Sequence, residues 1–296
     1  MNAVFPPGAI HIALTFDDNF WAPAYAVMRS ACLSTRRRRD LVFHLGVAGI
    51  TPGHRLDLEK IASEFGATQV FYDLTQNQDF LRICGPLRAS KRFPPIAYAR
   101  LVLDRIVPDS IERIIYLDSD TLVIKPIEWL YDQDMQGNPI AAVSDPFGMH
   151  IMMGRDMRAK AGIFDPADPY FNSGVLLIDM AGFRAADVPK HLAGFVKNDL
   201  LRRLYFDQDM LNLIFRGRWT ALNWRFNTID PWRAQQAMGP YIIHYTGDQR
   251  PWHLLSLAPF HHMYRHTMTN ELFYRFWRHR IRQRWKKRFN RLLGRQ

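Results

Sequence analysis

Short apolar runs of strand length alternate with segments of helical periodicity along the first half of the chain, and this alternation restricts the possible folds more than any other feature. The predicted strands are Ile10–Phe16, Leu41–Val47, Val70–Leu74 and Arg113–Leu117. The predicted helices between them span residues 22–33, 52–65 and 96–106. Strands joined through helices run parallel in one sheet, with the helices packed on its faces. We therefore predict an α/β fold with a Rossmann-like, mostly parallel sheet, flanking helices and a ligand site at the carboxyl ends of the strands.

The second half of the chain continues this pattern and ends in a change of composition. Further strands are predicted at Ile140–Val143 and Gly174–Ile178, and a helix over Asp207–Phe215. We find no internal repeat and no low-complexity linker, and the composition changes only near Arg275. We predict one catalytic domain over residues 1–264 and a basic C-terminal extension over residues 265–296.

The basic charge of the chain is concentrated at its C-terminal end. The chain has 39 Lys and Arg against 28 Asp and Glu, and ten of the basic residues lie between Arg275 and the last residue, where no acidic residue occurs. Subtracting these ten from 39 leaves 29 basic against 28 acidic residues in the rest of the chain. The body is therefore nearly neutral, which argues against a nucleic-acid-binding domain and predicts no specific nucleic-acid partner.

Composition also excludes several other classes of protein. A hydrophobic content of 48% and an aromatic content of 13% exclude a disordered or collagen-like chain. Cys32 and Cys84 are too few for a disulfide framework or a cysteine metal cluster. No apolar run reaches the roughly 20 residues of a membrane-spanning helix, and residues 1–9 lack the pattern of a secretory signal. We expect a globular protein of the reducing cytoplasm.

The sequence Asp118-Ser119-Asp120 follows directly on a predicted strand. Side chains two residues apart on an extended segment point to the same side. Two carboxylates there can share one divalent cation, and oxygen ligands suit Mg²⁺ or Mn²⁺. The pattern is short and also fits a solvated turn, so its interpretation depends on the other motifs.

Six polar motifs occur in order between Ile10 and Trp252. They are Asp17-Asp18-Asn19, Ala97-Tyr98-Ala99-Arg100, Tyr116-Leu117-Asp118-Ser119-Asp120-Thr121, Tyr170-Phe171-Asn172-Ser173-Gly174-Val175, Asp207-Gln208-Asp209-Met210-Leu211-Asn212, and His244-Tyr245-Thr246-Gly247 with Arg250-Pro251-Trp252. This set resembles glycosyltransferase family 8, the retaining nucleotide-sugar transferases that include bacterial lipopolysaccharide galactosyl- and glucosyltransferases. The resemblance implies the glycosyltransferase A fold, a UDP-hexose donor (UDP-Gal or UDP-Glc) and a glycan or lipid-linked sugar acceptor, such as lipopolysaccharide core.

The resemblance also implies roles for individual residues. Asp118, Asp120 and His244 match the family's metal ligands, which hold Mn²⁺ or Mg²⁺ on the donor diphosphate. Gln208 matches the amide nearest the reacting anomeric carbon, and Asp207 is the alternative nucleophile. The remaining matches are donor-binding residues, namely Asp17 and Asn19 for the uridine, Arg100 for the phosphates and sugar, Asn172 and Asp145 for the sugar pocket, and Gly247 and Arg250 for the diphosphate.

Two positions depart from the family pattern. The Lys of the usual Gly-x-x-Lys-Pro-Trp motif is Arg250 here, which keeps the charge but changes the geometry of phosphate binding. Relatives often carry Tyr where this chain has Phe20, so an aromatic face remains and a hydroxyl is absent. Some matched positions also allow purely structural roles: Asp18 could cap the helix that follows it, and Asn172 could shape a turn.

The matched residues suit the departure of a nucleoside diphosphate. The negative charge that grows on the leaving group requires a positive environment, which a cation and Arg250 can supply. Retention by attack on the front face, in which the leaving phosphate takes the acceptor's proton, avoids a covalent intermediate. A glycosyl adduct on Asp207 remains the alternative.

The C-terminal extension has the pattern of a basic amphipathic helix. Its aromatic and aliphatic residues recur every three or four positions, at Phe273, Phe276, Trp277, Ile281, Trp285, Phe289 and Leu292. Such a helix is typical of a segment that lies on an anionic membrane surface. It is also compatible with a tail packed on the body or with a polyanion-binding segment. We expect peripheral attachment to the inner face of the membrane.

Two other functions compete with the transferase. A nucleotidyltransferase also places carboxylates and a metal on a nucleotide-binding fold, but it would more naturally show a Gly-rich phosphate loop after the first strand. A non-enzymatic membrane- or polyanion-binding protein built around the tail would leave the six upstream motifs unexplained.

Overall fold

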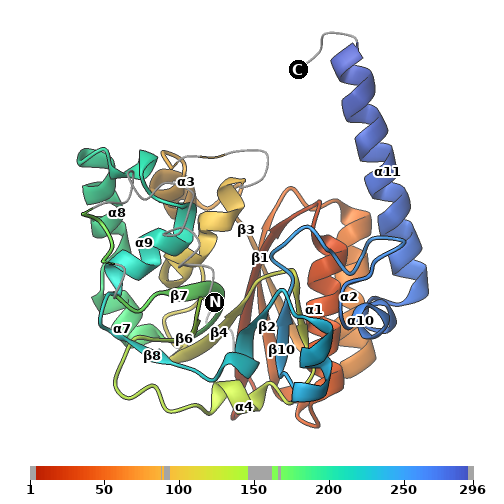
Figure 1. The fold of residues 1–296 in the computed structure, drawn as a ribbon, viewed down its shortest axis with the longest axis horizontal. Helices are drawn as coiled ribbons and strands as arrows, with labels where there is room; N and C mark the ends of the chain where they lie inside the picture. Colours follow the sequence, from red (N-terminus) through yellow and green to blue (C-terminus); the bar gives the residue numbers. More distant parts are fainter. Residues whose placement is uncertain (1–4, 88, 90–93, 146–161, 166–167, 293–296) are drawn as a thin grey trace.

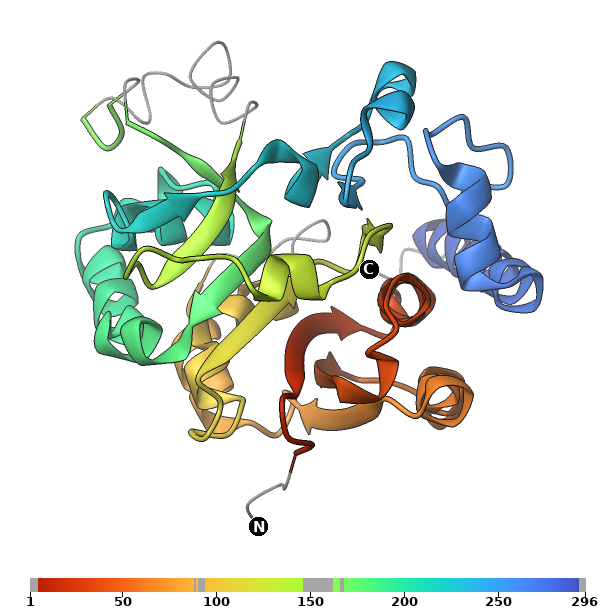
Figure 2. The same ribbon diagram turned by 90° about the horizontal axis from the view of Figure 1, so that it is seen from below.

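The computed structural model describes residues 5–87, 89, 94–145, 162–165 and 168–292. A seven-stranded sheet in the order β3-β2-β1-β4-β7-β6-β8 runs through the molecule (Figures 1 and 2). Its strands are β1 (Ile10–Asp17), β2 (Leu41–Ala48), β3 (Thr68–Asp73), β4 (Arg113–Leu117), β6 (Ile140–Ser144), β7 (Phe171–Asp179) and β8 (Trp219–Ala221). Neighbouring strands are parallel except at β7, which is antiparallel to both β4 and β6. The predicted mostly parallel α/β fold is confirmed.

Helices cover both faces of the large sheet. The α-helices of the body are α1 (Trp21–Ser34), α2 (Pro52–Phe65), α3 (Gln78–Cys84), α4 (Glu128–Tyr131), α7 (Met180–Ala185), α8 (Val188–Lys197) and α9 (Phe206–Ile214). Short 3₁₀ helices are η1 (Arg38–Asp40), η2 (Pro95–Arg105), η4 (Leu200–Arg202), η5 (Trp224–Asn227) and η6 (Arg233–Met238). Alternating residues of β1 point into two separate cores: Ile12 and Leu14 pack with α1, and Ala13 packs with η2 and α9.

The predicted elements of the first half are present, with two differences in form. Thr51 caps α2 as predicted, since its side chain accepts from the His54 N–H and Pro52 occupies the first helical position. The predicted helix over 96–106 is a 3₁₀ helix interrupted at Val102, where φ is −127°. Asp18 does not cap α1, which begins without a side-chain cap; its Oδ1 instead accepts from the Thr51 N–H at 2.9 Å and contacts His54 Nδ1 at 2.7 Å.

A second, three-stranded sheet lies beside the end of β4. Its order is β5 (Thr121–Val123), β10 (Ile242–His244), β9 (Thr228–Ile229), with β10 antiparallel to β5 and parallel to β9. In this register His244 lies opposite Thr121, the residue after Asp120. Backbone pairing thereby joins two parts of the chain more than a hundred residues apart.

The C-terminal segment forms two helices, α10 (His261–Met268) and α11 (Asn270–Leu292). The first turns of α11 belong to the core, since Phe273 and Phe276 are each 2% exposed and Phe276 packs edge-on against Trp21. Arg275 also donates to the buried Asp57 carboxylate at 2.7 Å. The far half extends away from the body (Figure 1) and exposes 65% of Trp285 and 62% of Phe289.

The predicted apolar face of this helix is therefore divided between a docked half, which carries Phe273 and Phe276, and a free half, which carries Trp285 and Phe289.

The side chains of Lys287, Arg291 and Leu292, and residues 293–296 with Arg295, lie outside the described residues. Within the described part of the chain, no helix is long and apolar enough to cross a membrane.

Candidate active site

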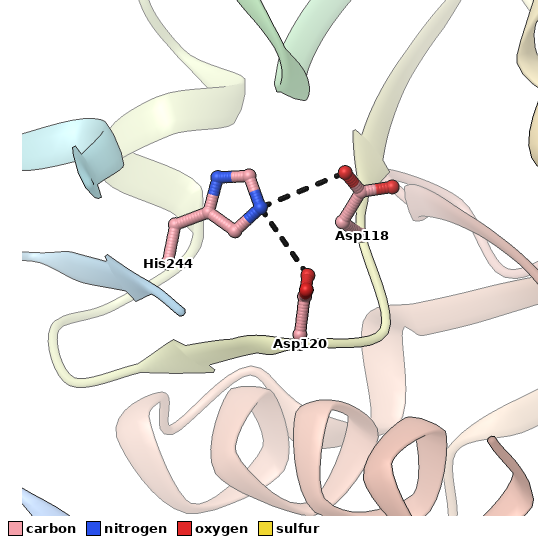
Figure 3. A group of neighbouring side chains, drawn as sticks. All are labelled: Asp118, Asp120 and His244. Carbon is pink, nitrogen blue, oxygen red and sulfur yellow. Dashed lines mark ion pairs between the residues drawn. The ribbon is translucent and has the colours of Figure 1, made fainter. Parts of the chain in front are cut away.

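Two carboxylates and an imidazole meet at the carboxyl end of β4. Asp118 and Asp120 follow this strand, and His244 ends β10 of the neighbouring sheet (Figure 3). One ligand atom from each of the three residues lies within 4.8 Å of the others. His244 Nε2 is 3.2 Å from Asp120 Oδ1 and 3.6 Å from Asp118 Oδ2. An oxygen, oxygen and imidazole-nitrogen set of this kind suits a divalent cation.

Gly174, on β7, leaves room for this cluster. A Cβ at position 174 would overlap His244 Cε1 and would lie 2.6 Å from Asp118 Oδ2. The backbone of β7 therefore has to be bare where it passes the cluster. The donor chemistry of the three side chains and this bare stretch of backbone both fit a bound metal ion.

Burial and charge act in opposite directions on the ionisation of the cluster. Burial alone would lower the pKa of His244, but attraction to Asp120 and Asp118 outweighs it and raises this pKa. Burial raises the pKa of Asp118, although the neighbouring Arg100 opposes that rise. Burial would also raise the pKa of Asp120, but His244 and Arg250 outweigh it, so this pKa is lowered.

Arg100 connects the cluster to Asp207. Its Nη2 is 2.6 Å from Asp118 Oδ1, and its Nε is 3.0 Å from Asp207 Oδ2. The guanidinium also donates to the Ser173 carbonyl at 2.8 Å. Its side chain is only 8% exposed, and attraction to Asp118 and Asp207 outweighs the desolvation and raises its pKa. Arg100 is thus a fixed cation between two carboxylates.

Asn172, Gln208 and Asp145 form a second polar group next to the cluster. Gln208 Nε2 donates to Asp145 Oδ2 at 2.8 Å, and Asn172 Nδ2 donates to Gln208 Oε1 at 3.1 Å and to Asp145 Oδ2 at 3.2 Å. Asp207 precedes Gln208 at the start of α9 and accepts from Ser173 Oγ at 3.1 Å. The structure therefore brings Asp145, Asn172, Asp207 and Gln208 together.

The segment after β10 places Arg250 beside Asp120. Arg250 Nη1 lies 2.5 Å from Asp120 Oδ2, and the side chain is 22% exposed. Gly247 donates its N–H to Asp230 Oδ1 at 2.8 Å, which fixes the turn between β10 and Arg250. A Cβ at position 247 would lie 3.1 Å from the Asp230 carboxylate.

Asp17 and Asn19 lie at the end of β1, the strand next to β4. Asp17 accepts from the Asn19 N–H at 2.9 Å and from Asn19 Nδ2 at 3.0 Å. These contacts hold the loop in one shape at the same edge of the sheet as the cluster. Phe20 follows and packs edge-on against Trp252 at 6.0 Å.

Three further residues support the site and were not among the predicted site residues. Gly174 lies within the motif Tyr170–Val175, so the sequence Asn-Ser-Gly could have indicated this residue. Tyr116 donates to Asp118 Oδ1 at 3.0 Å from the preceding strand. Asn227 Oδ1 lies 3.0 Å from His244 Nδ1, and no sequence motif marks this asparagine.

Comparison with known proteins gives one consistent result. The sequence profile of glycosyl transferase family 8 matches residues 11–256. General stress protein A of Bacillus subtilis is 26% identical over 280 residues, covering 88% of this chain and 93% of the relative. The lipopolysaccharide 1,3-galactosyltransferase of Salmonella typhimurium is 25% identical and covers 84% of this chain and 74% of its own length.

Solved structures support the same relationship. The galactosyltransferase LgtC, solved with donor and acceptor sugar analogs, superposes with a TM-score of 0.71 and 25% identity, covering 88% of this chain and 95% of its own. A likeness of this extent confirms the glycosyltransferase A fold. With the profile match over most of its length, the chain belongs to glycosyl transferase family 8.

Proposed function

We propose that this glycosyltransferase moves a hexose from UDP-Gal or UDP-Glc to a glycan acceptor, with a divalent cation on the donor diphosphate. The observation that carries the proposal is the convergence of Asp118, Asp120 and His244 within 4.8 Å at the carboxyl edge of the sheet. The Salmonella relative, a lipopolysaccharide 1,3-galactosyltransferase, supports a galactosyl donor and a lipopolysaccharide-type acceptor. LgtC, also a galactosyltransferase, supports the galactosyl donor. Lipopolysaccharide core or another surface glycan is the acceptor class we propose.

Asp118, Asp120 and His244 would hold Mn²⁺ or Mg²⁺. When bound, such a cation supplies Lewis-acid charge to the diphosphate leaving group. Arg250 lies against Asp120, so its remaining N–H groups can bind a phosphate oxygen beside the cluster. Gly247 shapes the turn that brings Arg250 there. At the adjoining strand end, Asp17 and Asn19 are the proposed uridine contacts.

The second polar group is the proposed sugar pocket. Asp145, Asn172 and Gln208 present carboxylate and amide groups suited to sugar hydroxyls, and Arg100 holds Asp207 in place beside them. These groups orient the donor so that its anomeric carbon faces Gln208.

We favour front-face displacement over a covalent intermediate. In that reaction the bond between the anomeric carbon and the diphosphate oxygen breaks while the acceptor oxygen bonds to the same face, and the acceptor's proton passes to the leaving diphosphate. Asp207 is engaged by Arg100 Nε at 3.0 Å and by Ser173 Oγ at 3.1 Å. Both contacts fall on Oδ2 and draw electron density from the carboxylate, which weakens Asp207 as a nucleophile. A trapped glycosyl adduct on Asp207 would overturn this part of the proposal.

We also propose that the free half of α11 holds the enzyme on the inner, anionic face of the membrane. The exposed Trp285 and Phe289 alternate with Arg284, Lys286 and Arg288, which together can bind an interfacial lipid layer. The docked half would keep the catalytic domain close to that surface.

The test of the proposed reaction is UDP release from a panel of UDP-sugars with Mn²⁺, with and without a chelator. Asp120→Ala should remove the metal-dependent turnover, because it removes a ligand and the partner of Arg250. Asp109→Ala is the matched control, since the Asp109 side chain is 96% exposed and pairs only loosely with Arg184 at 3.7 Å. Turnover that is unaffected by chelation and by Asp120→Ala would refute the metal-dependent mechanism.

A further inference from the structure

Asn227 ends η5 just before β9, and the pairing of β9 with β10 brings it alongside His244. Asn227 is 2% exposed and His244 is 3% exposed, so each depends on the other for hydrogen bonds that water cannot replace. Asn227 Oδ1 lies 3.0 Å from His244 Nδ1, and Asn227 Nδ2 lies 2.9 Å from Asn172 Oδ1. The asparagine thus links the metal cluster to the sugar pocket.

One backbone group determines the direction of each hydrogen bond between His244, Asn227 and Asn172. The Gly174 N–H can only donate, and its acceptor at 3.0 Å is Asn172 Oδ1. The atom of Asn227 that faces this oxygen must then be its NH₂ group, because two acceptors do not bond. Asn227 consequently turns its Oδ1 toward His244.

This orientation determines the tautomer of the histidine. An amide oxygen only accepts, so the proton of a neutral His244 lies on Nδ1. Nε2 is the nitrogen that faces Asp118 and Asp120, so in this tautomer its lone pair is available to a cation held between them. That is the form in which an imidazole binds a metal.

We propose that Asn227 is a positioning residue for His244: it fixes the Nδ1-protonated tautomer and the ring orientation, and it couples them through Asn172 to Gln208. The inference rests on the proposed metal site. Partners of this kind on a ligating histidine change metal affinity by roughly 10–100-fold when removed. Asn227 touches neither reacting atoms nor the cluster's carboxylates in any described contact, so its effect passes through His244 and Asn172.

Two substitutions separate the two halves of this role. Asn227→Leu removes both hydrogen bonds at similar size, and we expect Mn²⁺ affinity to fall by roughly 10–100-fold. Asn227→Asp still accepts from His244 Nδ1 but cannot donate to Asn172. We therefore expect its Mn²⁺ affinity to stay much closer to wild type than that of Asn227→Leu, because the partner of His244 Nδ1 is kept. Turnover should still fall, because the hydrogen bond between residue 227 and Asn172 is lost. Asn138→Leu is the control, since it removes an amide hydrogen bond to Thr220 in another part of the fold.

The measurements are titration of Mn²⁺ alone into the full chain and ¹⁵N NMR of the histidine rings in chelator-treated protein, with the pH raised until the His244 ring is neutral. Thermal unfolding confirms that each variant is folded. Wild type should show the His244 proton on Nδ1, and Asn227→Leu should lose this signature. Equal Mn²⁺ affinity of wild type and folded Asn227→Leu, or a proton on Nε2 alone in the wild type, would overturn the inference.

Failure of the proposed function gives a different result. If wild type bound no Mn²⁺, the proposed metal site would be wrong, and the NMR signature would still decide the tautomer. If wild type bound Mn²⁺ in an Asp120-dependent manner and Asn227→Leu did the same, only the role of Asn227 would be wrong.

Discussion

Gly174→Ala is the substitution that tests most directly whether the cluster depends on the bare backbone of β7. The added methyl would overlap His244 Cε1 and lie 2.6 Å from Asp118 Oδ2. Ordinary carbon contacts are about 3.5–4.0 Å, so the two ligands would have to move apart by about 1 Å. Neither can do so easily: Arg100 and Tyr116 hold Asp118, and Asn227 holds His244.

The expected effect has two parts. Overpacking a filled site costs about 1–3 kcal/mol of folding free energy, which should lower Tm by a few degrees in a chain of this length. A displacement of about 1 Å between ligands should reduce Mn²⁺ affinity and metal-dependent UDP release by about 100-fold, in line with the sensitivity of catalytic geometry. The loss of activity should therefore exceed what the loss of stability explains.

The assay compares Gly174→Ala with Gly194→Ala by Mn²⁺ titration, UDP release and thermal unfolding. Gly194 lies inside α8, and a Cβ there would meet nothing within 4 Å. Gly194→Ala should leave metal binding unchanged and raise stability slightly, since Ala is the better helix residue. Wild-type Mn²⁺ affinity in folded Gly174→Ala would refute the steric reasoning.

Three further outcomes follow from the structure. Arg250→Ala should weaken UDP binding by about tenfold but leave uridine binding unchanged, because it removes a charge-assisted phosphate contact. Calorimetric titration with UDP and with uridine checks this, and an equal loss of affinity for both ligands would contradict it. Burial would raise the pKa of Asp57, but hydrogen bonds from Arg275 and Lys60 outweigh it and lower this pKa. The ionised Asp57 therefore stabilises the fold above pH about 4, and this stabilisation is lost as the pH falls and the carboxylate is protonated. Asp57→Asn should reduce the fall in Tm between neutral and acidic pH. Deleting residues 284–296 should abolish binding to anionic vesicles and spare UDP release, whereas vesicle binding that persists would exclude the free half of α11 as the anchor.

The first half of the fold could be predicted because its elements are long enough to show their own periodicity. β1 and β2 each have eight residues, and α2 carries its capping signal at Thr51 and Pro52. By contrast, β5, β9 and β10 have only three, two and three residues. Strands this short have no periodicity and form only because they pair with one another. The small sheet that brings His244 to Asp118 could therefore not be predicted from local sequence.

The site shows the same division. Asp118 and Asp120 were identifiable from their spacing after a strand, whereas His244 was identified only through the family resemblance. Asn227 carried no signal, because a single asparagine after an aromatic residue occurs in many turns. Its position depends on β9–β10 pairing and on the orientation of Asn172, which are properties of the folded chain.

The two arginines at the cluster differ in how firmly they are held, and this difference indicates which of them can change partner when the donor binds. Arg100 is 8% exposed and contacts Asp118, Asp207 and the Ser173 carbonyl at once, so moving it would leave the buried Asp207 and the partly exposed Asp118 without their counter-charge. Arg250 is 22% exposed and contacts one carboxylate, Asp120, together with the Thr246 carbonyl and the ring of Trp252. A ligand phosphate can replace Asp120 as its partner at little cost, since Asp120 keeps His244 beside it. Arg250 is therefore suited to follow the charge of the leaving diphosphate, while Arg100 keeps the carboxylates in place.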